Sequence, residues 1–119
     1  MKNILVVDDE LNIRTSLARE LRDYQFNIIP AETGLVGLSK LEKQKVDLIL
    51  LDLDMPIMNG IEFAEQVSKE FSYLPIVILS GNITKTRLAD LMSKNKNIID
   101  VLAKPWDHEK LIAILENAI

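Results

Sequence analysis

Three short apolar runs limit the folds open to this chain more than any other feature. They cover residues 4–7, 48–51 and 76–79, and no polar residue interrupts them. A strand with one face in water alternates apolar and polar side chains, whereas a strand covered on both faces is apolar throughout. The three runs therefore predict central, parallel strands that helices cover on both sides.

Two further segments have the pattern of strands at the edges of a sheet. Residues 26–30 and 98–103 mix apolar with polar residues, and Pro30 closes the first, as a proline is best tolerated where a hydrogen-bonded ladder ends. Between the strands, apolar residues recur at helical spacing in five segments. These residues are Ile13, Leu17, Leu21 and Tyr24; Leu35, Leu38 and Leu41; Phe63, Val67 and Phe71; Leu88, Leu91 and Met92; and Leu111, Leu115 and Ala118.

Five strands that alternate strictly with five helices predict a doubly wound α/β fold. The right-handed crossovers of such a chain place helices on both faces of one parallel sheet. With the second and fifth strands at the edges, the predicted strand order is 2-1-3-4-5, as in flavodoxin-like folds. Residues 1–119 are expected to form one domain, and Thr33, Asn59, Thr84 and Asp107 stand where helix N-caps are expected.

Composition removes several classes of function. The chain has 14 basic and 18 acidic residues, and its net charge of −4 argues against binding to nucleic acid or to an acidic membrane surface. It has no cysteine and one histidine, His108, so a metal would have to be held by oxygen ligands. The apolar run at residues 4–7 is too short for a signal peptide or a membrane span, which predicts a cytoplasmic location.

Polar residues follow the predicted strands at the edge where a doubly wound fold binds its ligand. Asp8 and Asp9 follow the first strand, Asp52 the third, Ser80 the fourth and Lys104 the fifth. Parallel strands bring these residues to the same edge, beside the switch point between strands one and three. Clustered carboxylates repel one another unless a cation lies between them, and a set of oxygen ligands favours Mg²⁺.

The same residues have the chemistry needed to receive a phosphoryl group. An aspartate can act as a nucleophile towards phosphorus and form an acyl phosphate, and Asp52 is the candidate because it stands alone after the middle strand. Phosphoryl transfer requires mainly positioning and neutralisation of charge. Lys104 is the fixed positive group for one phosphoryl oxygen, and the Ser80 hydroxyl is a donor to another.

These motifs resemble the receiver domain of two-component response regulators over essentially the full length of the chain. The matching pieces are Asp8-Asp9, Leu51-Asp52-Leu53-Asp54-Met55-Pro56, Met58-Asn59-Gly60, Ser80-Gly81 and Lys104-Pro105. The resemblance implies that Asp52 accepts a phosphoryl group from a phosphohistidine on a sensor histidine kinase or a phosphotransfer protein. It implies no enzyme activity beyond the domain's own phosphorylation and slow dephosphorylation.

The resemblance also implies a set of ligands. Mg²⁺ would be bound by Asp9, Asp52 and the main-chain carbonyl of Leu53, with Asp8 nearby or acting through water. Ser80 and Lys104 would bind the phosphoryl oxygens, and the Lys104-Pro105 peptide bond would be cis, an isomer that X-Pro bonds reach at modest cost.

Several positions are candidates for modulating the site. Asp54 is either a solvated loop carboxylate or, with Asn82, a residue that sets the lifetime of the acyl phosphate by orienting or repelling water. Many family members have an aromatic residue three positions before the lysine that swings inward on activation, and Val101 stands there in this chain. Trp106 either packs over the start of the last helix or marks receivers that belong to larger regulators.

Three other functions would use the same residues. A receiver-like module could signal by contact without being phosphorylated. A haloacid-dehalogenase-type phosphatase would use Asp52 and Asp54, but Pro56 departs from its motif and the chain has no room for a cap. A flavodoxin-like FMN carrier would need a phosphate loop after the first strand, where Asp8 and Asp9 would repel a phosphate that brings no metal.

The output surface is predicted on the helix that follows Ser80. Movement of Ser80 towards a phosphoryl group would pull residues 81–84, and the fourth helix has the thinnest apolar stripe. The face formed by the fourth helix, fifth strand and fifth helix would then bind an effector or a second copy of the chain. Ile112, Ile114 and Ile119 either serve such a partner or are buried in their own domain. The sequence leaves open the kinase, the stimulus, the target, and whether the domain is free-standing or part of a longer protein.

Overall fold

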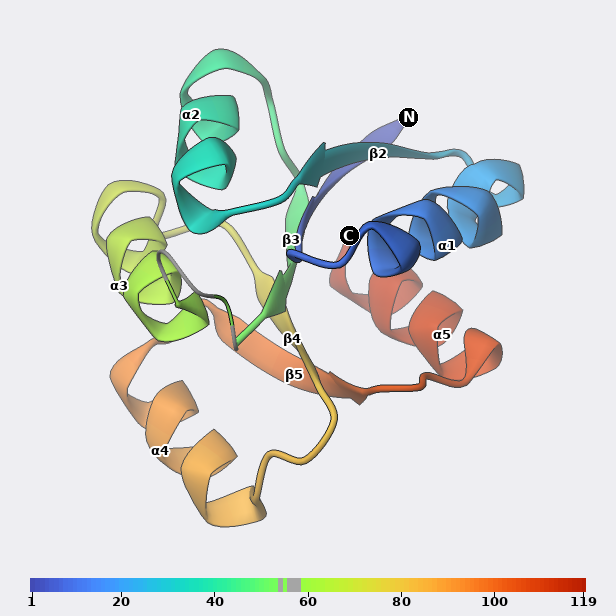
Figure 1. Ribbon diagram of the computed structural model, residues 1–119. Helices are drawn as coiled ribbons and strands as arrows, with labels where there is room; N and C mark the ends of the chain where they lie inside the picture. The colour runs from blue at the N-terminus through green and yellow to red at the C-terminus, as the bar shows by residue number, and fades with distance from the viewer. Residues whose placement is uncertain (54, 56–58) are drawn as a thin grey trace.

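A computed structural model describes residues 1–53, 55 and 59–119, in which strands and helices alternate from end to end (Figure 1). The elements in chain order are β1 (Lys2–Val7), α1 (Leu11–Leu21), the 3₁₀ turn η1 (Arg22–Tyr24), β2 (Phe26–Ala31), α2 (Gly34–Lys43), β3 (Leu48–Asp52), α3 (Gly60–Glu70), β4 (Ile76–Ser80), α4 (Lys85–Lys94), β5 (Ile98–Ala103) and α5 (His108–Ala118).

The strands form one parallel sheet in the order β2-β1-β3-β4-β5. Helices α1 and α5 cover one face, and α2, α3 and α4 cover the other (Figure 1). The predicted fold class, strand order and placement of helices are therefore confirmed.

The central strands are apolar because both of their faces are buried. Every residue of β3 and β4 is buried, and β1 is buried from Ile4 to Val7. Alternate side chains enter different cores: Leu5 and Val7 pack under α2, α3 and α4, whereas Ile4 and Val6 pack under α1 and α5. The edge strands β2 and β5 mix buried and exposed residues, as predicted.

Local chemistry explains where most helices begin. The side chains of Thr33, Asn59 and Thr84 accept hydrogen bonds from the backbone N–H groups three residues on, which satisfies donors that the first helical turn leaves unpaired. Asp107 is at the N-cap position of α5 but makes no such bond with its side chain. Three of the four predicted caps are therefore confirmed as side-chain caps.

Two residues of the predicted apolar stripes are exposed. Tyr24 is 41% exposed, because α1 ends at Leu21 and the 3₁₀ turn rotates the chain before Gln25 adopts a left-handed φ of 62°. Leu35 is 55% exposed. The inward face of α2 is formed instead by Gly34, Gly37 and Leu41, and a Cβ on Gly37 would lie 2.9 Å from the ring of Phe63. The glycines let α2 approach α3, which a count of apolar residues cannot show.

The extra apolar residues of α5 lie against their own domain. Ile112 is buried, and Ile114 and Ile119 are half-buried against the core under α1 and α5. This placement favours the interpretation that they belong to the fold. In the described ranges 1–53, 55 and 59–119, no helix combines the length and apolar character required to cross a membrane.

Candidate functional site

The ends of β1, β3 and β5 bring three charged side chains into contact. Lys104 Nζ lies 2.8 Å from Asp8 Oδ2 and 3.6 Å from Asp52 Oδ1. Asp8 is fully buried, Asp52 is 6% exposed and the Lys104 side chain is 17% exposed. Each residue ends or directly follows a parallel strand, so the topology of the sheet alone places them together.

Ser80 lies at the same edge, at the end of β4. Its carbonyl accepts a hydrogen bond from Lys104 N at 2.9 Å, and its hydroxyl oxygen accepts one from Asn82 N at 3.4 Å. A cavity of about 380 Å³ opens at this edge, and it is lined by Glu10, Asp52, Gly81, Asn82 and Lys104. The predicted residues Asp52, Asn82 and Lys104 thus share one cavity, and Ser80 contacts two of these residues, Asn82 and Lys104, through their backbone N–H groups.

The three acidic residues after β1 form a compact group. Asp8, Asp9 and Glu10 each place a carboxylate oxygen within 4.8 Å of those of the other two. Asp9 and Glu10 are exposed, whereas both oxygens of Asp8 have partners: Oδ1 accepts from Glu10 N at 2.9 Å, and Oδ2 accepts from Lys104. Asp8 is therefore bound into the protein, while Asp9 and Glu10 face solvent.

Glu10 belongs to the site but was not among the sequence predictions. Its Oε1 lies 4.0 Å from Lys104 Nζ, and it lines the cavity beside Asp52. The signal available in the sequence is its position directly after Asp8-Asp9, as a third carboxylate in the same loop.

The charges around Lys104 decide its protonation state. Burial acts to lower the pKa of Lys104, but the hydrogen bond that Lys104 donates to Asp8 and the charges of Asp8, Asp52 and Glu10 outweigh it, so the pKa is raised. Lys104 is therefore a permanent cation at neutral pH, held beside the carboxylate of Asp52.

The backbone after Asp52 is tightly packed against the start of α3. Gly60 N donates a hydrogen bond to the carbonyl of Leu53 at 2.8 Å. A Cβ on Gly60 would lie 2.5 Å from the Asp52 carbonyl oxygen, so no side chain fits at this position. The Leu53 carbonyl thus has one partner already, and a carbonyl oxygen has two lone pairs. Asp54 lies outside the described residues.

The remaining candidates lie away from the cavity. Val101 is half-buried and packs, with Ile83 and Met92, against the core under α4. Trp106 packs against the core under α1 and α5, which agrees with a packing role. The Lys104–Pro105 peptide bond is cis, as the resemblance implies.

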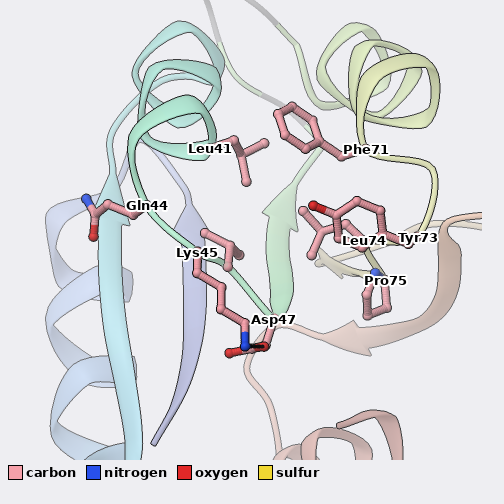
Figure 2. Close-up of a pocket in the computed structure, with 9 residues that line it drawn as sticks. Leu41, Gln44, Lys45, Asp47, Phe71, Tyr73, Leu74 and Pro75 are labelled. Atoms are coloured by element: carbon pink, nitrogen blue, oxygen red, sulfur yellow. Dashed lines mark ion pairs between the residues drawn. The ribbon is translucent and has the colours of Figure 1, made fainter.

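A second cavity, of about 290 Å³, lies at the opposite end of the sheet, before β3 and β4 (Figure 2). Leu41, Phe71 and Leu74 form its apolar wall, and Lys45 and Asp47 form an ion pair of 3.9 Å at its rim. None of the predicted site residues lines it, so the chemistry predicted from the strand ends belongs to the first cavity.

Comparisons with known proteins agree with this geometry. The response regulator receiver domain model matches residues 4–116. The response regulator ArlR of Staphylococcus epidermidis is 33% identical over 113 residues, which cover 95% of this chain and 50% of ArlR. The chain spans between 16% and 56% of the length of the first three curated relatives that it matches.

Two solved structures have the same fold. The chemotaxis protein CheY4 of Vibrio cholerae superimposes with a TM-score of 0.92 at 27% identity, covering 100% of this chain and 99% of that one. The response regulator TrrA of Thermotoga maritima, solved in complex with Mg²⁺-BeF, has a TM-score of 0.86 at 32% identity, with both chains covered fully. The matches extend over nearly all of the chain and decide against the phosphatase and FMN-carrier alternatives. The chain therefore belongs to the response regulator receiver domain family.

Proposed function

We propose that Asp52 accepts a phosphoryl group from a phosphohistidine on a sensor histidine kinase or a histidine phosphotransfer protein. The observation that carries this proposal is the position of Lys104 Nζ, 3.6 Å from Asp52 Oδ1 in a cavity at the carboxyl ends of the strands. A receiver that signals by contact alone has no need to hold a cation beside a buried carboxylate at a cavity.

The proposed transfer needs few groups beyond those in the cavity. A carboxylate oxygen of Asp52 attacks phosphorus, the bond between phosphorus and the imidazole nitrogen breaks, and the imidazole leaves with that electron pair. Lys104 then binds one phosphoryl oxygen, and the Ser80 hydroxyl donates to another. Positioning and neutralisation of charge supply most of the rate in such reactions. The domain would catalyse only its own phosphorylation and its own slow dephosphorylation.

The donor set fits a magnesium ion. Oxygen ligands are concentrated in the group of Asp8, Asp9 and Glu10, beside Asp52, and oxygen-only sets favour hard cations. We assign Asp9, Asp52 and the Leu53 carbonyl as ligands, with Asp8 adjacent or acting through water because both of its oxygens have partners. A bound Mg²⁺ would neutralise negative charge on the phosphoryl oxygens. The Mg²⁺-BeF complex of TrrA supports this assignment by similarity.

The proposed output is a shift of the face formed by α4, β5 and α5. The Ser80 hydroxyl already accepts a hydrogen bond from the backbone N–H of Asn82, and a Cβ on Gly81 would meet no atom within 4 Å outside residues 80–82. Residues 81–84 therefore have room to follow Ser80 towards a phosphoryl group. Val101 stands at the position of the usual aromatic residue, so this shift would take place without an aromatic side chain there. The shifted face would bind a downstream effector or a second copy of the domain, and we place this activity in the cytoplasm.

Phosphorylation by a small-molecule donor tests the proposal. The protein is incubated with acetyl phosphate and Mg²⁺, and its intact mass is measured. We expect a gain of one phosphoryl group, which requires Mg²⁺ and is absent from Asp52→Asn. An unmodified wild-type mass under forcing donor conditions would overturn the proposal and leave the contact-only module as the better description.

A further inference from the structure

Four side chains join α1 and η1 to the segment that follows Lys104, and neither phosphoryl transfer nor metal binding uses them. Trp106 Nε1 donates to Glu20 Oε2 at 2.7 Å, and His108 Nδ1 lies 3.1 Å from Glu20 Oε1. His108 Nε2 lies 2.9 Å from the hydroxyl of Tyr24. We call Glu20, Tyr24, Trp106 and His108 the Glu20 cluster.

The Glu20 cluster supplies a restraint that the segment's own helix does not. Asp107, at the N-cap position of α5, makes no side-chain bond to that helix. The segment is held instead by Glu20 on α1, through bonds to a carboxylate, which are stronger than bonds between neutral groups. The same helix holds the loop after β1, because Arg14 donates to the carbonyl of Asp8 at 2.8 Å. Helix α1 therefore hydrogen-bonds to Asp8 itself and to the segment that follows Lys104, which is the ion-pair partner of Asp8.

We propose that Glu20 is a positioning residue for Lys104. By fixing Trp106 and His108 against α1, its carboxylate limits where the ammonium of Lys104 lies relative to Asp8 and Asp52. The consequence for phosphorylation rests on the proposed function, in which Lys104 binds a phosphoryl oxygen. The restraint itself does not depend on that function and can be measured separately.

The hydrogen-bonding roles in the Glu20 cluster give the proposal a distinctive pH signature. Glu20 of α1 and Tyr24 of η1 face His108, and Asp107 and Glu109 are its neighbours along the chain. Neutral His108 can donate from Nδ1 to Glu20 and accept at Nε2 from Tyr24. When protonated it donates from both nitrogens, to Glu20 and to the Tyr24 oxygen. The wild-type cluster is therefore satisfied in both states.

A glutamine at position 20 satisfies the hydrogen bonds of the cluster in only one of the two protonation states of His108. Its amide oxygen can accept from Trp106, and its NH₂ group can donate to Nδ1 of neutral His108. Protonated His108 carries a hydrogen on Nδ1, which would then meet the NH₂ group without an acceptor. Glu20→Gln should therefore keep the cluster while His108 is neutral and lose it when His108 is protonated.

The test compares Glu20→Ala and Glu20→Gln with a matched control, Glu116→Ala, which removes an exposed carboxylate on α5. Trp106 is the only tryptophan of the chain, so its fluorescence reports directly on the cluster. Acylation of Lys104, quantified by mass spectrometry with Lys85 as internal reference, reports the accessibility of the ammonium. The rate of phosphorylation by acetyl phosphate with Mg²⁺ reports the consequence.

For Glu20→Ala we expect red-shifted emission, faster acylation of Lys104 and phosphorylation that is slower by about tenfold, as misplacement of a binding group predicts. Glu116→Ala should match the wild type. Glu20→Gln should match the wild type at high pH, where His108 is neutral, and show the emission and rate of Glu20→Ala at low pH, where His108 is protonated.

The proposal would be overturned if Glu20→Ala folds and neither the acylation of Lys104 nor the phosphorylation of Asp52 changes. It would also be overturned by a Glu20→Gln variant whose emission and phosphorylation rate, relative to the wild type, are the same at both pH values. If Glu20→Ala does not fold, the two pH values for Glu20→Gln decide alone. A wild-type protein that takes up no phosphoryl group refutes the proposed function, whereas acylation and fluorescence still decide whether Glu20 positions Lys104.

Discussion

Helices α3 and α4 cover the same face of the sheet and follow neighbouring strands, yet they are held very differently (Figure 1). The start of α3 lies so close to β3 that Gly60 has no room for a Cβ, and the helix buries Phe63, Ala64 and Val67 besides Gly60. Of the α4 residues, all of which the structure describes, Leu91 alone is buried. Before the helix, a Cβ on Gly81 would meet no atom within 4 Å outside residues 80–82.

This difference separates two tasks. Asp52, the proposed acceptor, ends the strand that leads to the firmly packed helix, and Ser80 ends the strand that leads to the loosely packed one. A phosphoryl acceptor needs fixed geometry, because small displacements are costly in rate. An output element needs two arrangements of similar free energy, so that the phosphoryl group can shift the equilibrium between them.

The largest expected loss of stability comes from truncating a core side chain of α3. Phe63→Ala removes a fully buried ring and should lower the free energy of unfolding by about 4 kcal/mol. In α4, the helix held less firmly, Met92→Ala removes a half-buried side chain and should lower the free energy of unfolding by about 1 kcal/mol. Urea denaturation measures both values. Equal losses would show that the two helices are held equally firmly.

Two glycines give a sharper version of the comparison. Gly60→Ala forces a Cβ against the backbone of Asp52 and should cost about 3 kcal/mol. Gly81→Ala places the same methyl group in open space and should change stability by no more than about 0.5 kcal/mol. Thermal and urea unfolding of the matched pair check this, and a destabilised Gly81→Ala would contradict the open loop before α4.

Magnesium should stabilise the folded protein, by a smaller amount than the loss expected for Gly60→Ala. Binding to the folded state alone adds about 1.4 kcal/mol at ten times the Kd, by mass action. The melting temperature should therefore rise with Mg²⁺, and Asp9→Asn should weaken this response while stabilising the metal-free protein through reduced repulsion. A melting temperature that ignores Mg²⁺ would leave the acidic group without a role in metal binding.

The smallest expected effect concerns the lifetime of the acyl phosphate. The Asn82 side chain belongs to the loop before α4 and lines the cavity beside Asp52. If it orients or hinders the attacking water, Asn82→Ala should change the dephosphorylation rate by about threefold. A change of this size lies within the net free energy of one hydrogen bond. Loss of phosphoryl group is followed by intact mass. Unchanged rates in Asn82→Ala and Asp54→Asn together would end the hypothesis that these residues set the lifetime.

Much of this architecture could be predicted because its causes are local. Uninterrupted apolar runs predicted the buried strands, and parallel pairing then brought Asp8, Asp52, Ser80 and Lys104 to one edge. Glu10 was accessible to the same reasoning, because it directly follows Asp9.

Features that depend on contacts distant in sequence escaped prediction. Glu20 meets Trp106 and His108 across 86 and 88 residues, and no periodicity in the sequence reports such a pair. Leu35 was assigned to the core because the packing of Gly37 against Phe63 is visible only in three dimensions. Tyr24 was missed for a local reason, because α1 ends at Leu21 and Tyr24 lies in the 3₁₀ turn that follows.

Hydrogen exchange measured by mass spectrometry, on samples whose intact mass reports the phosphoryl group on Asp52, tests the central claim most directly. Amides of α4 and of residues 81–84 should be less protected than those of α3 before phosphorylation and should change on phosphorylation, while α3 stays the same. Exchange that changes equally in α3 and α4, or in α3 alone, would contradict the account of a firmly held acceptor that signals through a loosely held helix.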